Sequence, residues 1–237
     1  MNQKILFLLT VAAILISCEK DNNSLQLAGQ YKPNTNGSVG PVIMYSSQGQ
    51  VTNAVAIQSF LQRQGVENEF IFSGSSFPIG SNDLFTLAIT QNNKVTISAA
   101  ILTEPRQAEI VDQTSSQLLI ALIDSVQSFI PIGNNNRCAV LYPAIKKINS
   151  EKKYTPLPPG SGYSGVFTFR TMFPIEIENG QFTLPLTTFL VSSSTVNNSC
   201  MNSVSNEWNT FNPDIITQLQ TGDTIVYQTK RVQLLKQ

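Results

Sequence analysis

The stretch from Ile175 to Leu184 alternates apolar and polar residues on both sides of Asn179-Gly180. A period of two places the apolar side chains of a strand on one face. An Asn-Gly pair between such runs strongly indicates a tight hairpin, because both turn residues must adopt positive φ. We therefore predict an antiparallel hairpin with one buried face.

The same alternation predicts β-structure for most of the remaining chain. Phe85, Leu87 and Ile89 alternate with small or polar residues up to a turn at 91–93, and the pattern resumes at 95–101. Further strands are predicted at 41–46, 69–73, 107–113, 117–126, 138–147, 165–173, 186–192 and 224–235.

Two helices are predicted between the strands. Thr52 or Asn53 caps a first helix over 53–64, which Gly65 ends. Asn212-Pro213-Asp214 provides a cap, a proline and an acid for a second helix, which Gly222 ends. The segment 154–165 is rich in proline and glycine, so it is predicted to be an irregular surface loop.

Strands joined mostly by short turns predict a mainly β protein with two short helices, either an antiparallel barrel or a β-sandwich. Gly29 and Tyr31 resemble the opening Gly-x-Trp motif of lipocalins, with Tyr in place of Trp. The late helix and strand at 212–235 also resemble lipocalin topology, whereas the helix at 53–64 departs from it. The resemblance implies a lipocalin-like barrel, a fold that holds a small ligand.

The N-terminus resembles that of bacterial lipoproteins. Lys4 precedes an apolar run at 5–16, which is shorter than the ~20 residues that a spanning helix needs and is typical of a secretory signal peptide. The run ends in Leu-Ile-Ser-Cys, which resembles a lipobox with Ile16 at a position where Ala or Ser is more common. The resemblance implies cleavage before Cys18 and lipidation of its sulfur. The alternatives are an ordinary signal peptide with a chance cysteine and an N-terminal core segment.

The polar run Glu19–Asn23 looks like the signal that exports lipoproteins of Bacteroidota to the cell surface, with Asn22 in place of a second acid. We therefore expect a signal peptide at 1–17, a lipidated Cys18 and flexible tether at 18–26, and a single β-rich domain at 27–237. The expected location is the outer membrane, at the cell surface, with the periplasm-facing leaflet as the alternative.

The chain contains no His, and 15 Lys and Arg balance 15 Asp and Glu. The absence of His excludes Ser-His-Asp and Cys-His catalytic arrangements and removes the commonest neutral metal ligand. No large basic cluster is present, which argues against a nucleic-acid partner. The sequence also lacks a Gly-rich phosphate loop and a cysteine pair at zinc spacing, so we expect no cofactor and no metal.

Carboxylates remain as candidates for acid–base chemistry. Glu176 and Glu178 share a strand face, which we expect to be solvated and opposite to the core. Asp112, Asp124 and Glu109 come nearest to a buried pair, because they belong to the predicted 107–126 hairpin. Residues at such positions more often solvate strand ends.

Three aromatic residues are candidates for stacking on sugars or for lining a groove, namely Trp208, Phe211 and Tyr163. A lone Trp near the start of a helix is more often a core anchor.

Four other residues are candidates for covalent modification. Cys138 and Cys200 form an even pair in an oxidising compartment, so we predict a disulfide between them, with two separately buried thiols as the alternative. Ser125 and Thr224 each follow Asp and precede an apolar residue, which matches the O-glycosylation motif of Bacteroidota envelope proteins.

These observations predict a lipid-anchored outer-membrane lipoprotein whose β-domain is not catalytic. One hypothesis places a small apolar ligand inside the barrel. The alternative is a structural or accessory module of an outer-membrane complex, which docks on a protein partner through a strand edge or loop face. An acid-pair hydrolase is the third, remote hypothesis. A hollow barrel would favour the carrier of a small ligand. A filled core with an exposed aromatic patch would favour the accessory module, and two converging buried carboxylates would favour the hydrolase.

Overall fold

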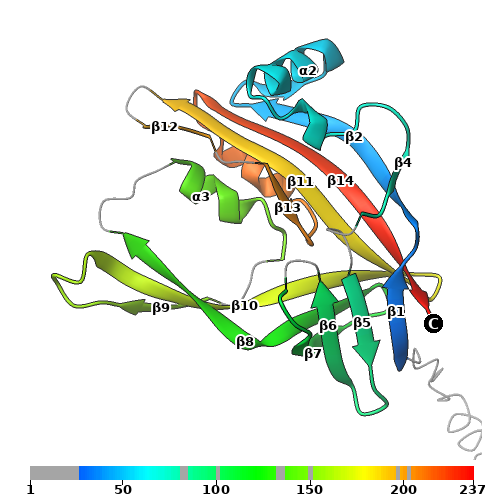
Figure 1. The fold of residues 1–237 in the computed structure, drawn as a ribbon. Coiled ribbons are helices and arrows are strands. Elements are labelled where there is room, and N and C mark those ends of the chain that lie inside the picture. Colours follow the sequence, from blue (N-terminus) through cyan, green and yellow to red (C-terminus); the bar gives the residue numbers. More distant parts are fainter. Residues whose placement is uncertain are drawn as a thin grey trace, which may run out of the picture.

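The structure of the chain, a computed structural model, describes residues 27–80, 85–99, 102–131, 137–148, 152–195, 198–201 and 204–237. Eight antiparallel strands close into a barrel, in which each strand pairs with the next along the ring (Figure 1). In ring order they are β1 (Gly29–Pro33), β5 (Phe85–Ile89), β6 (Lys94–Ala99), β7 (Arg106–Gln113), β8 (Gln117–Pro131), β10 (Tyr163–Glu178), β11 (Gln181–Thr195) and β14 (Asp223–Lys236). The pairing of β14 with β1 closes the ring, which confirms the predicted antiparallel barrel over the β-sandwich.

The predicted Asn-Gly hairpin joins β10 to β11. Asn179 and Gly180 have φ values of 51° and 75°, and Glu178 pairs with Gln181 across the turn. Both turn residues therefore occupy the left-handed region that a type I′ turn requires. The hairpin predicted at 85–101 is also present, as β5 and β6.

Several short turns lie at one end of the barrel, and we call this end the turn end. Gly29 pairs with Ile89 just before the 90–94 turn, and Phe182 pairs with Leu234 just after the 179–180 turn. Leu27 precedes Gly29 and so lies at the turn end. The long strands β8 and β10 start and finish there, and their other ends lie at the opposite end of the molecule (Figure 1).

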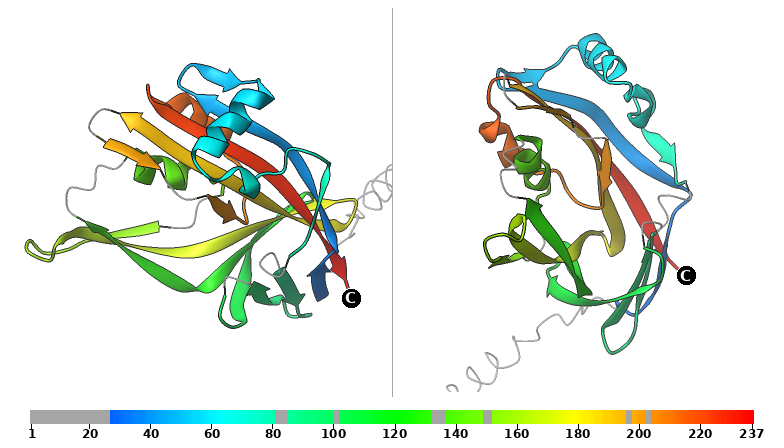
Figure 2. Two further views of the ribbon diagram at one scale, coloured as in Figure 1. Left: turned by 45° about the horizontal axis from the view of Figure 1, so that its top comes forward. Right: turned by 60° about the vertical axis from the view of Figure 1, so that its left-hand side comes forward.

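Three strands project from the barrel as a ribbon. β7 accompanies β8 only as far as Leu122, and β11 pairs with β10 only from Glu176 to Glu178. Beyond these points β8 and β10 remain paired with each other, and β9 (Lys152–Pro156) pairs with the outer side of β10. We call this three-stranded extension the ribbon (Figure 2).

The same continuous sheet also extends away from the ribbon as a diverging layer above the barrel, and we call this layer the second sheet. β11 and β14 stay paired along their length and form its centre. β11 is flanked by β12 (Asn198–Met201) and β13 (Ser205–Glu207), while β14 is flanked by β2 (Asn36–Ser46). Two short strands, β3 (Gly49–Val51) and β4 (Ser76–Pro78), pair with β2.

Helices cover both faces of this second sheet. On one face α3 (Arg137–Ala144) and the 3-10 helix η3 (Pro213–Gln218) pack with Phe189 and Val191. On the other face α2 (Ala54–Arg63), followed by the 3-10 helix η1 (Glu67–Glu69), packs with Leu190. The alternation of 189, 190 and 191 between two clusters follows from the period of two along a strand.

The first predicted helix is confirmed, and its cap is the one expected. Asn53 Oδ1 accepts a hydrogen bond from the backbone N–H of Ala56 at 3.1 Å, which satisfies a free donor of the first turn. Gly65 follows the helix with a φ of 69°, a conformation that favours glycine after a helix end.

The strand predicted at 69–73 is wrong, because a side chain takes the place of a neighbouring strand. The fully buried amide of Gln228 accepts from the backbone N–H of Ile71 at 3.0 Å and donates to its carbonyl at 2.7 Å. It also donates to the carbonyl of Gly40 at 2.9 Å. Gln228 thus fastens the segment after η1 to β14 and β2 without a strand ladder.

The strand predicted at 138–147 is also wrong, since residues 138–144 belong to α3 and the helix ends there. Cys138, Leu141 and Ile145 are three and four residues apart and are at most 1% exposed. This spacing places Cys138 and Leu141 on one face of α3, and Ile145, directly after the helix, packs with them on β11 and β14.

Two further predictions need correction. The second predicted helix exists only as the short η3, because Leu219 is already extended and leads into a turn before β14. The segment 154–165 is not an irregular loop throughout. It contains most of β9 and the start of β10, joined by a turn at 157–162.

Candidate functional site

Side chains fill the barrel interior that the described residues line. Phe85 lies at the centre, with its ring 5.5 Å from Phe173 and 5.8 Å from Trp208. Tyr31 stacks on Phe182 at 4.7 Å near the turn end. Other interior side chains that are fully buried are Leu87, Ile97, Leu118, Ile120, Ile175 and Leu184. This packing resembles that of small barrels whose interior is filled by side chains alone.

A depression of about 410 Å³ lies at the turn end. Its walls include Tyr31, Phe182, Leu235 and Lys236. The Lys236 ammonium lies 5.9 Å from the centre of the Tyr31 ring. The depression is open to solvent on the outside of the packed core, so it differs from the enclosed cavity expected of a lipocalin-like carrier.

A polar junction lies where the ribbon, α3 and β13 meet. The Tyr142 hydroxyl donates to Glu207 Oε1 at 3.0 Å, and Lys146 Nζ lies 3.5 Å from Glu207 Oε2. Burial is the largest cause that raises the pKa of Tyr142, and the charge of Glu207 adds to it, so the hydroxyl remains a donor at neutral pH. Glu207 therefore has both oxygens engaged by its neighbours.

The junction opens into a cleft of about 50 Å³ between Trp208 and Met172. A water needs roughly 10–15 Å³ of such space, so the cleft has room for ordered water. The neighbouring Asn209 side chain bonds both backbone groups of Ile148, at 3.1 and 2.8 Å, and so closes the cleft on that side.

The carboxylates singled out in the sequence do not converge on a buried site. Glu176 and Glu178 lie on the outer barrel face and both contact the guanidinium of Arg231, as expected for the face opposite to Ile175 and Ile177. The other three candidates, Asp112, Asp124 and Glu109, are all exposed. Asp124 pairs with Arg106 at 3.2 Å, and Glu109 pairs with Arg170 at 2.7 Å.

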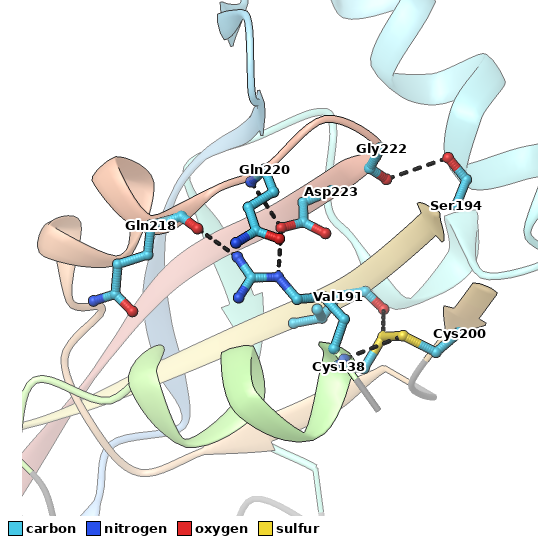
Figure 3. A network of polar contacts seen from close by, with 9 residues as sticks. Cys138, Val191, Ser194, Cys200, Gln218, Gln220, Gly222 and Asp223 are labelled. Carbon is cyan, nitrogen blue, oxygen red and sulfur yellow. Dashed lines mark hydrogen bonds and ion pairs between the residues drawn. A yellow bond between two sulfur atoms is a disulfide. The ribbon is translucent and has the colours of Figure 1, made fainter. Parts of the chain in front are cut away.

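Asp223 is the one buried carboxylate among the described residues, and sequence reasoning missed its role. Its Oδ2 accepts from Arg137 Nε at 2.8 Å and from the backbone N–H of Gln220 at 2.9 Å (Figure 3). Arg137 also donates to the carbonyl of Gln218. The pair fixes the start of α3 to the start of β14. Asp223 Oδ1 and the nearby Ser193 Oγ have no hydrogen-bond partner within the described residues.

A disulfide joins Cys138 to Cys200 beside this ion pair, across 62 residues of sequence (Figure 3). Cys138 lies in the first turn of α3 and Cys200 in β12. The N-terminus of α3 is therefore held to the second sheet both by a covalent bond and by the Arg137–Asp223 pair. Both links tie the helix to strands that lie far from it in sequence.

Exposed apolar side chains gather on the ribbon. Val126, Phe129, Tyr154 and Tyr163 are between 42% and 51% exposed, and we call them the ribbon patch. The rings of Phe129 and Tyr163 lie 5.3 Å apart. The register places Val126 and Tyr154 on one face of the ribbon and Phe129, beside Tyr163, on the other, so both faces carry exposed apolar side chains. Exposed apolar residues that cluster in this way are typical of interaction surfaces.

Tyr154 completes the ribbon patch because of a glycine beneath it. A Cβ at Gly165 would lie 2.3 Å from the Tyr154 ring, so a glycine at 165 is needed to leave room for that ring. Tyr154 also lies 5.4 Å from Phe167 and donates to the carbonyl of Ser164 at 3.0 Å. The aromatic side chain is therefore held in place although nearly half of it is exposed.

The remaining sequence candidates have different surroundings. Trp208 and Phe211 are buried core residues, and Phe211 stacks on Tyr227 at 3.6 Å, so of the three aromatic candidates only Tyr163 is exposed. Ser125 is exposed on the ribbon, whereas Thr224 is half-buried between β11 and β2. The lipidation candidate Cys18 lies outside the described residues.

Comparison with family models finds no match, and comparisons with curated proteins and with solved structures find none either. Within the described ranges, no group of three potential metal ligands from His, Cys, Asp and Glu occurs. The helices in those ranges are all too short or too polar to cross a membrane.

Proposed function

We propose that this protein is a lipid-anchored outer-membrane lipoprotein, exposed at the cell surface, whose β-domain acts as a non-catalytic interaction module. Lipid on Cys18 provides the attachment, and the ribbon provides the contact with protein partners. The proposal takes the accessory-module hypothesis in preference to the carrier of a small apolar ligand.

The observation that supports an interaction module is the contrast between the inside and the outside of the barrel. Inside, the rings of Phe173 and Trp208 lie 5.5 and 5.8 Å from the ring of Phe85, and the surrounding core side chains are buried. Outside, the ribbon patch leaves Phe129 51% exposed and Val126 48% exposed. An apolar ligand requires enclosed volume, whereas a protein partner requires an accessible apolar surface with polar surroundings.

The first described residue, Leu27, and the ribbon patch lie at opposite ends of the described structure. Cys18 precedes Leu27 by nine residues, a length of chain that spans at most about 30 Å when extended. Leu27 lies at the turn end, and β8 carries Phe129 away from that end. The patch is therefore separated from the point of membrane attachment and remains available to partners.

Membrane attachment is tested by substituting the lipid-bearing residue. We expect Cys18→Ala to remove incorporation of labelled palmitate and to release the protein from membranes, because the attachment requires acyl chains. The ribbon-patch variant Phe129→Ala is the matched control and should remain membrane-bound. Palmitate incorporation that persists in Cys18→Ala would contradict the anchor.

The contact through the ribbon is tested by thiol accessibility in cells. A cysteine substituted for Tyr163 should react with a membrane-impermeant maleimide at least several-fold more slowly on intact cells than on the purified protein, because a partner covers it. Val55, on α2 and 72% exposed, is the control position, and a cysteine there should react equally in both settings. Equal reactivity of both cysteines on cells and in solution would reject the ribbon as the contact surface.

A further inference from the structure

Two polar atoms lie unpaired in the core beside α3. Asp223 Oδ1 and Ser193 Oγ have no hydrogen-bond partner within the described residues, although Asp223 is only 1% exposed and Ser193 only 2% exposed. Buried polar groups in folded proteins are nearly always hydrogen-bonded, because an unpaired group loses its hydration without compensation. Two such atoms close together therefore indicate a site for a small ligand that can hydrogen-bond to both.

The strand register brings the two side chains together. Ser193 stands directly opposite Asp223 on β14 and directly opposite Cys200 on β12. Residues paired in this way project to the same face of a sheet. This face is the one that Val191, two residues before Ser193, presents to α3. Ser193 therefore lies between the disulfide and the Arg137–Asp223 ion pair.

The spacing of the two side chains suits one small bridging molecule. No hydrogen bond joins these two described side chains directly. The Cβ atoms of directly opposed strand residues lie roughly 4.5–5.5 Å apart. A water that makes two hydrogen bonds of about 2.8 Å joins oxygens that are up to about 5.5 Å apart. A single water therefore has the size needed to bridge Ser193 and Asp223.

The charge of the site distinguishes a water from a cation. Asp223 Oδ2 accepts from Arg137 Nε at 2.8 Å, so a guanidinium already balances the charge of the carboxylate. A metal ion at Oδ1 would add an uncompensated positive charge to a buried site, which is costly. A water adds no charge. It donates one hydrogen to the carboxylate, which only accepts, and its second bond joins the Ser193 hydroxyl, which donates or accepts.

We propose that Asp223 Oδ1 and Ser193 Oγ bind a single internal water, which completes the hydrogen bonding of the Arg137–Asp223 pair. Both carboxylate oxygens are then engaged, Oδ2 by Arg137 and the backbone N–H of Gln220, and Oδ1 by the water. Cys138 is fully buried beside the site, and the Arg137 side chain is 16% exposed. Exchange of the water with solvent therefore requires the first turn of α3 to move. The site depends neither on the lipid anchor nor on the ribbon.

Oxygen-17 relaxation dispersion of the purified full-length protein provides one measurement, because it detects long-lived internal waters and has no contribution from hydroxyl protons. Ser193→Val fills the site and removes the hydroxyl, so the dispersion amplitude should fall by the contribution of one water. Ser194→Val, at the adjacent exposed position, is the matched control and should leave the amplitude unchanged. An amplitude that is the same in Ser193→Val and in the wild-type chain would overturn the proposal.

A crystal structure of the wild-type chain, grown in a rubidium salt, decides the question without any substitution. We expect density for one water within about 3.2 Å of both Asp223 Oδ1 and Ser193 Oγ, with no anomalous rubidium peak at the site. A rubidium peak beside the carboxylate would show a cation site and overturn the proposal. A direct hydrogen bond between Ser193 and Asp223, with no water between them, would overturn it as well.

Discussion

We expect Phe85→Ala to lower the free energy of unfolding by about 3–5 kcal/mol, the range observed when a large aromatic side chain is removed from a packed core. Phe85 is fully buried and is the residue at which the aromatic side chains of the barrel meet. Its removal leaves a cavity that Phe173 and Trp208 cannot fill without leaving their own contacts. Urea denaturation with a fluorescence readout measures the change in the free energy of unfolding from the shift in the urea concentration at the midpoint.

Phe129→Ala is the matched control for this substitution, since it removes the same group from the ribbon patch. Phe129 is 51% exposed, so we expect a loss of less than about 1 kcal/mol. Equal losses at the two positions would mean that the barrel interior is not tightly packed. The filled-barrel interpretation would then be wrong.

Asp223→Ala should lower the free energy of unfolding by a similar amount, for a different reason. The side chain of Asp223 is 0% exposed and that of Arg137 is 16% exposed. Removing one member of a buried ion pair typically costs about 3–5 kcal/mol, because the other charge remains buried without its partner. The backbone N–H of Gln220 also loses its acceptor. Thermal or urea unfolding measures the loss, with the Cys138–Cys200 disulfide kept oxidised.

The outer-face pair of Glu178 and Arg231 is the control for this prediction. The side chain of Glu178 is 70% exposed, and exposed pairs contribute roughly 0–1 kcal/mol. The double variant Arg137→Ala/Asp223→Ala should recover part of the stability lost in Asp223→Ala, because no unpaired charge then remains. A double variant that is less stable than the single one by the full cost of a second independent substitution would contradict the paired-charge account.

Seven of the eight barrel strands could be predicted from the sequence, most of them from regular alternation, whereas β1 (Gly29–Pro33) was not predicted as a strand. The Asn179-Gly180 hairpin had both the right turn residues and the right alternation, and the structure confirms it. The strand predicted at 138–147 is wrong because a continuous apolar stretch has no period that distinguishes a strand from a buried helix. Only packing on Phe189 and Val191 makes it helical.

The features that define the candidate sites depend on contacts between distant residues. Gln228 and Ile71 are 157 positions apart, and Arg137 and Asp223 are 86 apart. Local patterns carry no information about such pairings. The full length of β8 was missed for a related reason. The alternation supported a strand over 117–126, whereas pairing with β10 extends it to Pro131, and the early departure of β7 leaves its other side open.

The central claim is that the barrel is filled and that the protein acts through its outer surface. Titration of the purified protein with a fluorescent fatty acid tests this claim most directly, with Phe85→Ala as the variant in which space has been created. We expect no saturable binding to the wild-type chain. Saturable binding with a stoichiometry of one, displaced by an unlabelled fatty acid, would show an apolar ligand site and would contradict the account.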